Sequence, residues 1–176
     1  MSEIIPYLNL ACLVFIILLM LKAALHKAFD FLEFQGFVAD YELIPEKLIK
    51  PFSAALVGLE LASVGMMLVN SLRDYGLMLA IALFIVYAIA IGINLLRGRT
   101  SIECGCGGAP QLLGPVLIWR NALLVLAAAL PLAGIPENMS APDILIAMAA
   151  GIFLWTLYSL FEQTNANLIF LKSKKI

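Results

Sequence analysis

The sequence predicts an all-α membrane protein: a single integral-membrane domain over residues 1–176, built as a bundle of four to five transmembrane helices. The first reason is composition. Hydrophobic residues make up 63% of the chain and charged residues 13%, whereas soluble domains hold about 45–50% apolar and about 25% charged residues. The second reason is that the apolar residues form long runs, and about 20 residues of helix cross a bilayer core. In lipid, such runs must be helical to satisfy their own backbone groups.

Charge and cysteine content exclude two other classes of protein. The 11 Lys and Arg residues against 12 Asp and Glu residues leave a formal net charge of −1. Such a balance lacks the basic stripe that nucleic-acid binding requires. Three cysteines in 176 residues are also too few for a fold held together by disulfides.

Five apolar runs predict the membrane spans. They cover residues 4–25, 52–72, 77–96, 112–135 and 142–161. The first run follows a Met-Ser-Glu start without the basic region of a cleavable signal peptide, so we expect it to remain as the first spanning helix. The links at 71–76 and 136–141 are short and turn-like.

The first loop, residues 26–51, is long and mixed in character. Aromatic and aliphatic residues alternate there with charged ones between Lys27 and Glu42. This mixture is typical of an amphipathic helical segment that lies along the membrane interface. Pro45 ends the segment, because the residue before a proline avoids the α conformation.

Counting crossings places the first loop, the third loop at 97–111 and the C-terminus on one face of the membrane. We therefore expect His26, Lys27 and Tyr41 to be able to approach Cys104 and Cys106. The loops at 71–76 and 136–141 lie on the opposite face.

Cys104-Gly105-Cys106 is the most specific chemical signal in the chain. Cα atoms two residues apart lie within about 7 Å, and disulfides need about 4.4–6.8 Å. A bridge is therefore feasible but strained, and strained bridges are labile. Gly105, Gly107 and Gly108 remove Cβ atoms that would block an unusual turn, and they let another protein's backbone approach the sulfurs. The arrangement suits a bridge that is made and broken.

Two other interpretations of the pair stay open. The cysteines are small apolar residues in a glycine-rich loop, or they bind a metal. Zinc requires four ligands, and the chain offers one further cysteine and one histidine. A Cu(I) pair is the remaining metal alternative, and we assign no metal ligands. Cys12, in the middle of the first span, is interpreted as a small buried hydrophobe.

His26 and Lys27 follow the first predicted span directly. A cation near a thiol stabilises its thiolate, so both residues are candidates for tuning the cysteines. The alternative for His26 is an interfacial position without a redox role.

Glu60 and Arg120 are the ionisable groups well inside the predicted spans. Both lie eight residues from the start of their spans, about 12 Å from the same membrane face. A charge in hydrocarbon costs about 2.5–3.5 kcal/mol on insertion scales, and pairing is the usual relief. We predict an ion pair between them. The alternative is that Arg120 reaches the near interface and that Glu60 is protonated.

Three motifs together resemble the signature of the MauE family of methylamine utilisation proteins. They are INLLRGR at 93–99, IECGCGG at 102–108 and WRN at 119–121. Further segments are similar to the broader DoxX-like group: KAALHK at 22–27, YELIP at 41–45 and Glu60. The likeness runs from the first helix through the fourth.

The resemblance implies a bacterial inner-membrane protein that matures methylamine dehydrogenase. The small (β) subunit of that periplasmic enzyme carries many disulfides and a tryptophan tryptophylquinone cofactor, and the family's usual partner is the thioredoxin-like protein MauD. The helical arrangement also resembles vitamin K epoxide reductases, which pass disulfides to thioredoxin-like domains and draw on quinone. By resemblance, a quinone is the candidate cofactor.

These expectations lead to one main hypothesis and two alternatives. The main hypothesis is a thiol–disulfide oxidoreductase component in which Cys104 and Cys106 exchange with a thioredoxin-like partner. The first alternative is a membrane scaffold that stabilises the partner or client without turnover. The second is a small-solute or metal transporter, for which five short helices offer few internal polar groups.

The distribution of basic residues and the family resemblance predict opposite orientations in the membrane. The face of the cysteines carries nine basic residues: Lys22, Lys27, Lys47, Lys50, Arg97, Arg99, Lys172, Lys174 and Lys175. The opposite face carries Arg73. The positive-inside rule would place the nine-charge face in the cytoplasm, whereas the resemblance implies a periplasmic partner and client. We follow the resemblance and expect Cys104 and Cys106 at the periplasmic face.

Overall fold

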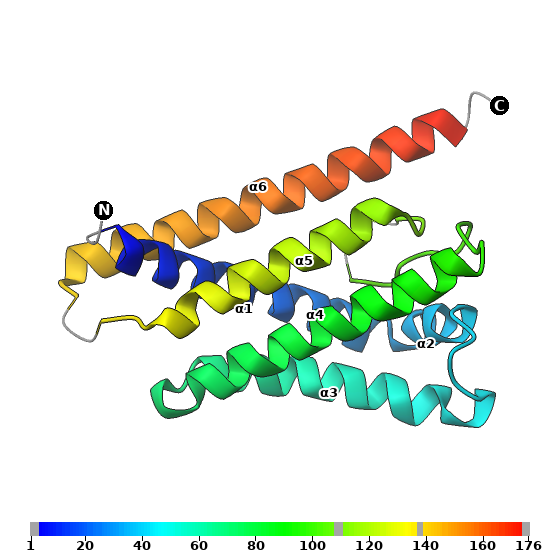
Figure 1. Cartoon of the computed structure of the whole chain (residues 1–176), viewed down its shortest axis with the longest axis horizontal. Helices are drawn as coiled ribbons and strands as arrows, with labels where there is room; N and C mark the ends of the chain where they lie inside the picture. Colours follow the sequence, from blue (N-terminus) through cyan, green and yellow to red (C-terminus); the bar gives the residue numbers. More distant parts are fainter. Residues whose placement is uncertain (1–3, 108–110, 137–138, 174–176) are drawn as a thin grey trace.

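The chain folds into a helical bundle in the computed structural model, which describes residues 4–107, 111–136 and 139–173 (Figure 1). The α-helices of this part are α1 (Ile5–Phe29), α2 (Phe31–Asp40), α3 (Ile49–Met67), α4 (Arg73–Leu96), α5 (Pro115–Ala129) and α6 (Ala141–Ser173). Short 3-10 turns, η1 (Glu46–Leu48), η2 (Asn70–Leu72) and η3 (Leu130–Ala133), extend α3, α4 and α5. The described residues contain no strand beyond one isolated bridge, between Glu103 and Leu112.

In the part of the chain that the structure describes, five helices are long and apolar enough to cross a membrane, which confirms the multi-pass prediction. With their adjoining turns they are Ile5–Phe29, Glu46–Met67, Asn70–Leu96, Pro115–Ala133 and Ala141–Asn167. Two ends differ from the hydropathy prediction. The first helix continues past Leu25 to Phe29, and the last continues past Phe161 to Ser173. Both extensions carry charged residues into the bundle.

Helix α1 is the centre of the bundle. It packs against α6 on one side and against α3 on another, while α4 packs between α3 and α5. In the most apolar window of α1, 44% of the residues are buried, against 11% in α6. Leu145, Phe153 and Phe161 on α6 are each more than 60% exposed, as expected of a peripheral helix facing lipid.

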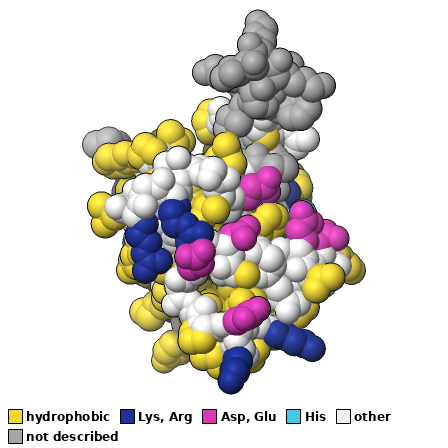
Figure 2. All heavy atoms as spheres, turned by 90° about the vertical axis from the view of Figure 1, so that its right-hand side faces the viewer, with side chains coloured by type: hydrophobic (Ala, Val, Ile, Leu, Met, Phe, Trp, Pro, Cys, Tyr) yellow, Lys and Arg dark blue, Asp and Glu magenta, His cyan; other side chains and the backbone are white. Residues whose placement is uncertain are grey.

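The predicted amphipathic segment of the first loop is helix α2. It packs on α3 and buries Phe34, while Leu32 is 83% exposed. In Figure 1, α2, the loop at 97–114 and the end of α6 lie at the same end of the bundle. The placement predicted by counting crossings is confirmed for the two loops and the described end of α6, while Lys174 and Lys175 lie outside the described residues. Lys, Arg, Asp and Glu side chains gather on this end (Figure 2).

Candidate functional site

The loop that carries the cysteines is described over residues 97–107 and 111–114 (the cysteine loop), and these two parts are hydrogen-bonded to each other. The backbone N–H of Cys104 donates to the Gln111 carbonyl at 2.8 Å, and that of Leu113 donates to the Ile102 carbonyl at 3.0 Å. These bonds satisfy backbone groups that a loop cannot leave unpaired when buried. They also fix the position of Cys104 at the end of the bundle.

Cys104 and Cys106 are joined by a disulfide, with Cα atoms 5.4 Å apart. Their surroundings differ, since Cys104 is 8% exposed whereas Cys106 is partly exposed. The Tyr41 hydroxyl donates to the Cys104 carbonyl at 3.0 Å. Burial raises the pKa of Tyr41 to about 12, so this hydroxyl keeps its proton at neutral pH.

Gly105 and Gly107 are required both by conformation and by packing. Their φ angles are +64° and +78°, a region that favours glycine. A Cβ on Gly105 would lie 2.7 Å from the Phe37 Cβ, and one on Gly107 would lie 2.8 Å from the Ala23 Cα. The predicted unusual turn is confirmed, and its close contacts are made with α1 and α2 of the same chain. Gly108 lies outside the described residues.

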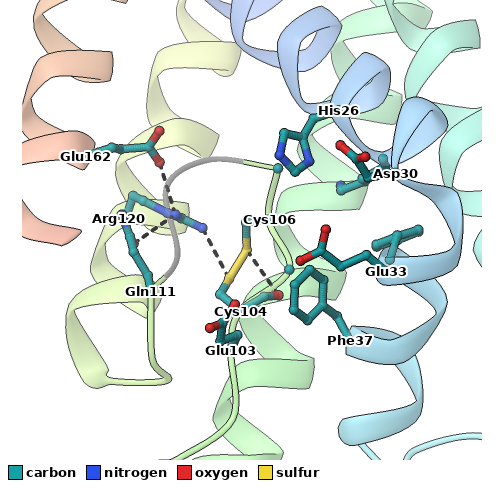
Figure 3. Close-up of a pocket in the computed structure, with 14 residues that line it drawn as sticks. His26, Asp30, Glu33, Phe37, Glu103, Cys104, Cys106, Gln111, Arg120 and Glu162 are labelled. Atoms are coloured by element: carbon teal, nitrogen blue, oxygen red, sulfur yellow. Dashed lines mark hydrogen bonds and ion pairs between the residues drawn. A yellow bond between two sulfur atoms is a disulfide. The ribbon is translucent and has the colours of Figure 1, made fainter. Parts of the chain in front are cut away.

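A polar pocket of about 110 Å³ opens beside the disulfide (Figure 3). The end of α1, helix α2, the cysteine loop, α5 and α6 contribute charged or polar lining residues: His26, Lys27, Asp30, Glu33, Glu103, Gln111, Arg120 and Glu162. The structure thus brings both predicted tuning residues, His26 and Lys27, to the pocket of the cysteines.

Arg120 on α5 makes the contact to the disulfide (Figure 3). Its Nη2 lies 3.8 Å from the Cys104 Sγ. Its Nη1 lies 3.3 Å from Glu162 Oε1 on α6 and 3.5 Å from Gln111 Oε1. The guanidinium therefore contacts both a carboxylate and a disulfide sulfur.

Glu162 gathers two further side chains around this arginine. The Tyr158 hydroxyl donates to Glu162 Oε1 at 2.8 Å, and Lys22 Nζ on α1 lies 3.9 Å from Glu162 Oε2. Two cations thus share one carboxylate beside the cysteine loop. We call Lys22, Arg120 and Glu162 the Arg120 cluster.

A second ion pair lies between α1, α3 and α4. Lys27 Nζ contacts Glu60 Oε1, and the two side chains are 3% and 1% exposed. The Tyr87 hydroxyl donates to the same Glu60 oxygen at 2.6 Å. Lys27 Nζ also lies 4.7 Å from the centroid of the Tyr87 ring, a cation–π distance. We call these three residues the Lys27 cluster.

The structure corrects the predicted pairing of Glu60 with Arg120, because each has another partner. Hydropathy ends the first predicted span at Leu25 and the last at Phe161, so Lys27 and Glu162 fall outside the predicted spans. Both helices run on, so both residues lie inside the bundle. The i, i+4 spacing of the polar residues Tyr158 and Glu162 is a sequence signal that the last helix continues past Phe161.

The candidates for thiol tuning are also reassigned in part. Lys27 lines the pocket, but its Nζ is engaged by Glu60 and Tyr87. His26 lines the pocket as an exposed side chain. The contact to a sulfur comes instead from Arg120.

An apolar cavity of about 140 Å³ reaches the cysteines from between α2, α3 and α4. Val38, Phe52, Leu56, Val86, Tyr87 and Ala90 are among the residues that line it, together with Cys104 and Cys106. The disulfide therefore borders a polar pocket and an apolar cavity.

Cys12 lies away from this site. Cys12 is a buried free cysteine, about 20 Å along α1 from His26. In the part of the chain that the structure describes, no group of three or more His, Cys, Asp or Glu side chains is placed to hold a metal ion.

Comparison with known proteins gives one family. The family described as methylamine utilisation protein MauE matches residues 5–134. The Methylamine utilization protein MauE of Methylophilus methylotrophus is 34% identical over 158 residues, 87% of this chain and 83% of that protein. The protein of the same description from Methylorubrum extorquens is 42% identical over 117 residues, 65% and 62% of the two chains. That of Paracoccus denitrificans is 34% identical over 138 residues, 77% and 74%. No solved structure matches significantly.

Proposed function

The chain belongs to the MauE family of methylamine utilisation proteins, and from this membership and its site we propose that it is a membrane thiol–disulfide redox protein of methylamine utilisation. Its cysteine pair exchanges with a thioredoxin-like partner of the MauD type and so supports disulfide formation in a periplasmic client. By resemblance the client is the small (β) subunit of methylamine dehydrogenase. The observation that carries the proposal is the Cys104–Cys106 bridge, held beside a polar pocket at the end of the bundle.

The chemistry needed is ordinary thiol–disulfide exchange. A thiolate of the reduced partner attacks one sulfur of the bridge, a mixed disulfide forms, and the other cysteine leaves as a thiolate. The partner's second thiol loses its proton and attacks the partner's bonded sulfur. The partner leaves with a disulfide, and the chain is left with two reduced cysteines.

Repeated turnover needs an acceptor for two electrons and two protons, and we propose a lipid-soluble quinone. A bound quinone would supply that acceptor chemistry. The apolar cavity fits an aromatic ring, because it is lined by Phe52, Val86 and Tyr87 and extends to both cysteines. Phe52 and Val86 are 40% and 47% exposed, so the cavity borders the outer surface of the helices.

We also propose that the cysteines face the periplasm. One of the nine charges that favour the opposite orientation, Lys27, is not a loop charge, because it lies buried in α1 against Glu60. A membrane-impermeant maleimide on intact spheroplasts tests this, in a Cys12→Ser, Cys104→Ser variant that keeps Cys106 alone. Labelling of Cys106 is expected. Labelling that appears only in inside-out vesicles would contradict the proposal.

The redox role is tested by replacing both cysteines. A Cys104→Ser, Cys106→Ser variant is expected to abolish disulfide formation in the client, while the control Cys12→Ser keeps it. The measurement is the number of client disulfides, counted by alkylation and mass, at matched membrane levels of each variant. Full client maturation by the doubly substituted variant would favour the scaffold alternative.

A further inference from the structure

We propose that the two cysteines have fixed and different roles: Cys106 is the sulfur that the partner attacks, and Cys104 is the leaving thiolate, stabilised by Arg120. This rests on the proposed function, since it assigns roles within the proposed exchange. Arg120 acts through Cys104 and is therefore a positioning residue.

The first support is access. Cys104 is 8% exposed and packs with Ile91, Leu113 and Leu117. Both cysteines line the polar pocket, but Cys106 is partly exposed whereas Cys104 is buried. Which sulfur is attacked depends on access, so the partner thiolate reaches Cys106 more readily.

The second support is anchoring. The backbone N–H of Cys104 donates to Gln111, and its carbonyl accepts the Tyr41 hydroxyl. These bonds do not involve the sulfur and persist when the disulfide opens. Cys104 therefore stays beside Arg120 after its sulfur is released.

The third support is charge. Arg120 Nη2 lies 3.8 Å from the Cys104 Sγ, and a neighbouring arginine stabilises a thiolate. In the Arg120 cluster, Lys22 and Arg120 share the single carboxylate of Glu162. A Cys104 thiolate would balance the remaining positive charge.

Other titratable groups face the same pocket. They are His26, Lys27 and Asp30 at the end of α1, Glu33 on α2, Tyr41 after α2, Glu103 in the cysteine loop, and Tyr158 and Glu162 on α6. The carboxylates of Asp30, Glu33 and Glu103 oppose a thiolate at either cysteine. Lys27 is neutralised by Glu60. Within the described residues, the charged side chain in direct contact with a cysteine sulfur is Arg120, and its contact singles out Cys104.

The partner's thiolate forms a bond to the Cys106 Sγ, and the bond from Cys106 to Cys104 breaks. The electron pair of that bond stays on the Cys104 sulfur, which takes up no proton while Arg120 balances its charge. The partner's second thiol then gives up its proton and releases Cys106, which leaves the partner oxidised.

The assignment is tested on the chain with both cysteines present. Detergent-solubilised Cys12→Ser protein in its oxidised form is mixed with a reduced single-cysteine variant of the thioredoxin-like partner, and the freed thiol is alkylated at once. Fragment mass spectra then show which cysteine holds the partner. We expect the partner on Cys106 and the alkyl group on Cys104. The reverse or an equal distribution would overturn the roles but keep the proposed function. No mixed disulfide at all would overturn both.

The part of Arg120 is tested in a Cys12→Ser, Cys106→Ser background, which keeps Cys104 alone. The rate of Cys104 alkylation by iodoacetamide is followed against pH. Arg120→Gln is expected to move the midpoint of the profile up by about one pH unit, a tenfold loss of thiolate at a given pH, whereas Arg120→Lys keeps most of the effect. An Arg120→Gln, Glu162→Gln variant guards against misfolding, because it leaves no unpaired carboxylate. The profile of this double variant is compared with that of Glu162→Gln alone, and equal midpoints in the two folded variants would overturn the role of Arg120.

Discussion

The two ion clusters of this bundle differ in how completely their charges are matched. In the Lys27 cluster, one cation meets one carboxylate, and the Tyr87 hydroxyl adds a hydrogen bond. Its two charged side chains are at most 3% exposed. In the Arg120 cluster, two cations share one carboxylate, and the arginine and glutamate side chains are 15% and 9% exposed. The second cluster also touches a disulfide sulfur.

Burial and charge balance separate structural charges from reactive ones in this bundle. A neutral, closed pair has no charge left to offer to chemistry, and breaking it leaves an uncompensated charge in a low-dielectric interior. A cluster with an excess cation at the edge of a pocket stabilises an anion that forms there. Substitutions in the Lys27 cluster should therefore change stability, whereas those in the Arg120 cluster should change reactivity.

The largest stability effect is expected from breaking the Lys27 cluster. Lys27→Met or Glu60→Gln alone should destabilise the protein by about 3–5 kcal/mol, the usual range for a buried pair that loses one partner. The double variant should recover part of this loss, because no unpaired charge remains. Thermal melting in detergent measures all three variants, and strictly additive losses would show that the two residues do not interact.

The next effect separates the packing of the cysteine loop from its charges. Gly107→Ala should cost more than about 1–2 kcal/mol, the usual penalty of a left-handed alanine, because its Cβ would also meet the Ala23 backbone at 2.8 Å. Gly98→Ala is the matched control, since its φ is +74° and nothing lies within 4 Å of its added Cβ. Equal melting temperatures for the two variants would show that the contact with Ala23 does not constrain the loop.

The Arg120 cluster should respond to Glu162→Gln with a change in reactivity of opposite sign to that of Arg120→Gln. Removing the carboxylate leaves Arg120 and Lys22 unbalanced, so the Cys104 thiolate gains stabilisation. The expected loss of stability is about 1–3 kcal/mol, from hydrogen bonds to a charged group. Cys104 alkylation at pH 7 should become faster. Slower alkylation in a folded Glu162→Gln protein would contradict the charge argument.

The smallest effect is expected from Tyr41→Phe, which removes the hydrogen bond to the Cys104 carbonyl. The free energy of unfolding should fall by about 0.5–1.5 kcal/mol at neutral pH. Burial raises the pKa of Tyr41 from 10.0 to about 12, so the folded state keeps this proton longer than the unfolded state. The resulting stability is present below pH 10 and is lost as pH rises through 12. The gap in stability between wild type and Tyr41→Phe should therefore narrow above pH 10. A gap that widens would contradict the buried hydroxyl.

The membrane bundle and the cysteine loop could be predicted from the sequence, because each is encoded locally. Long apolar runs define the spans, and a Cys-Gly-Cys spacing allows a bridge. The ion pairs could not be predicted in the same way. Lys27 and Glu162 stand just beyond the apolar runs, and only packing against α3, α4 and α5 carries them into the bundle.

The contact between Arg120 and Cys104 shows the same limit of sequence reasoning. Arg120 was recognisable as a costly charge within a span, but its partners come from a loop and from α6. Which charge meets which depends on the rotation of each helix and on where it ends. Hydropathy determines neither.

The proposed function requires that the Cys104–Cys106 bridge is made and broken in the cell. Cells that carry the Cys12→Ser variant are treated briefly with a permeant reductant, washed and sampled over time into acid, and free thiols are then tagged with a heavy maleimide. We predict an oxidised bridge before treatment, two tagged cysteines directly after it, and a return of the bridge during the chase. We also predict a higher steady-state oxidised fraction in cells without the thioredoxin-like partner, because nothing then withdraws the disulfide. Cysteines that stay tagged throughout, or a steady-state oxidised fraction that does not depend on the partner, would contradict the account.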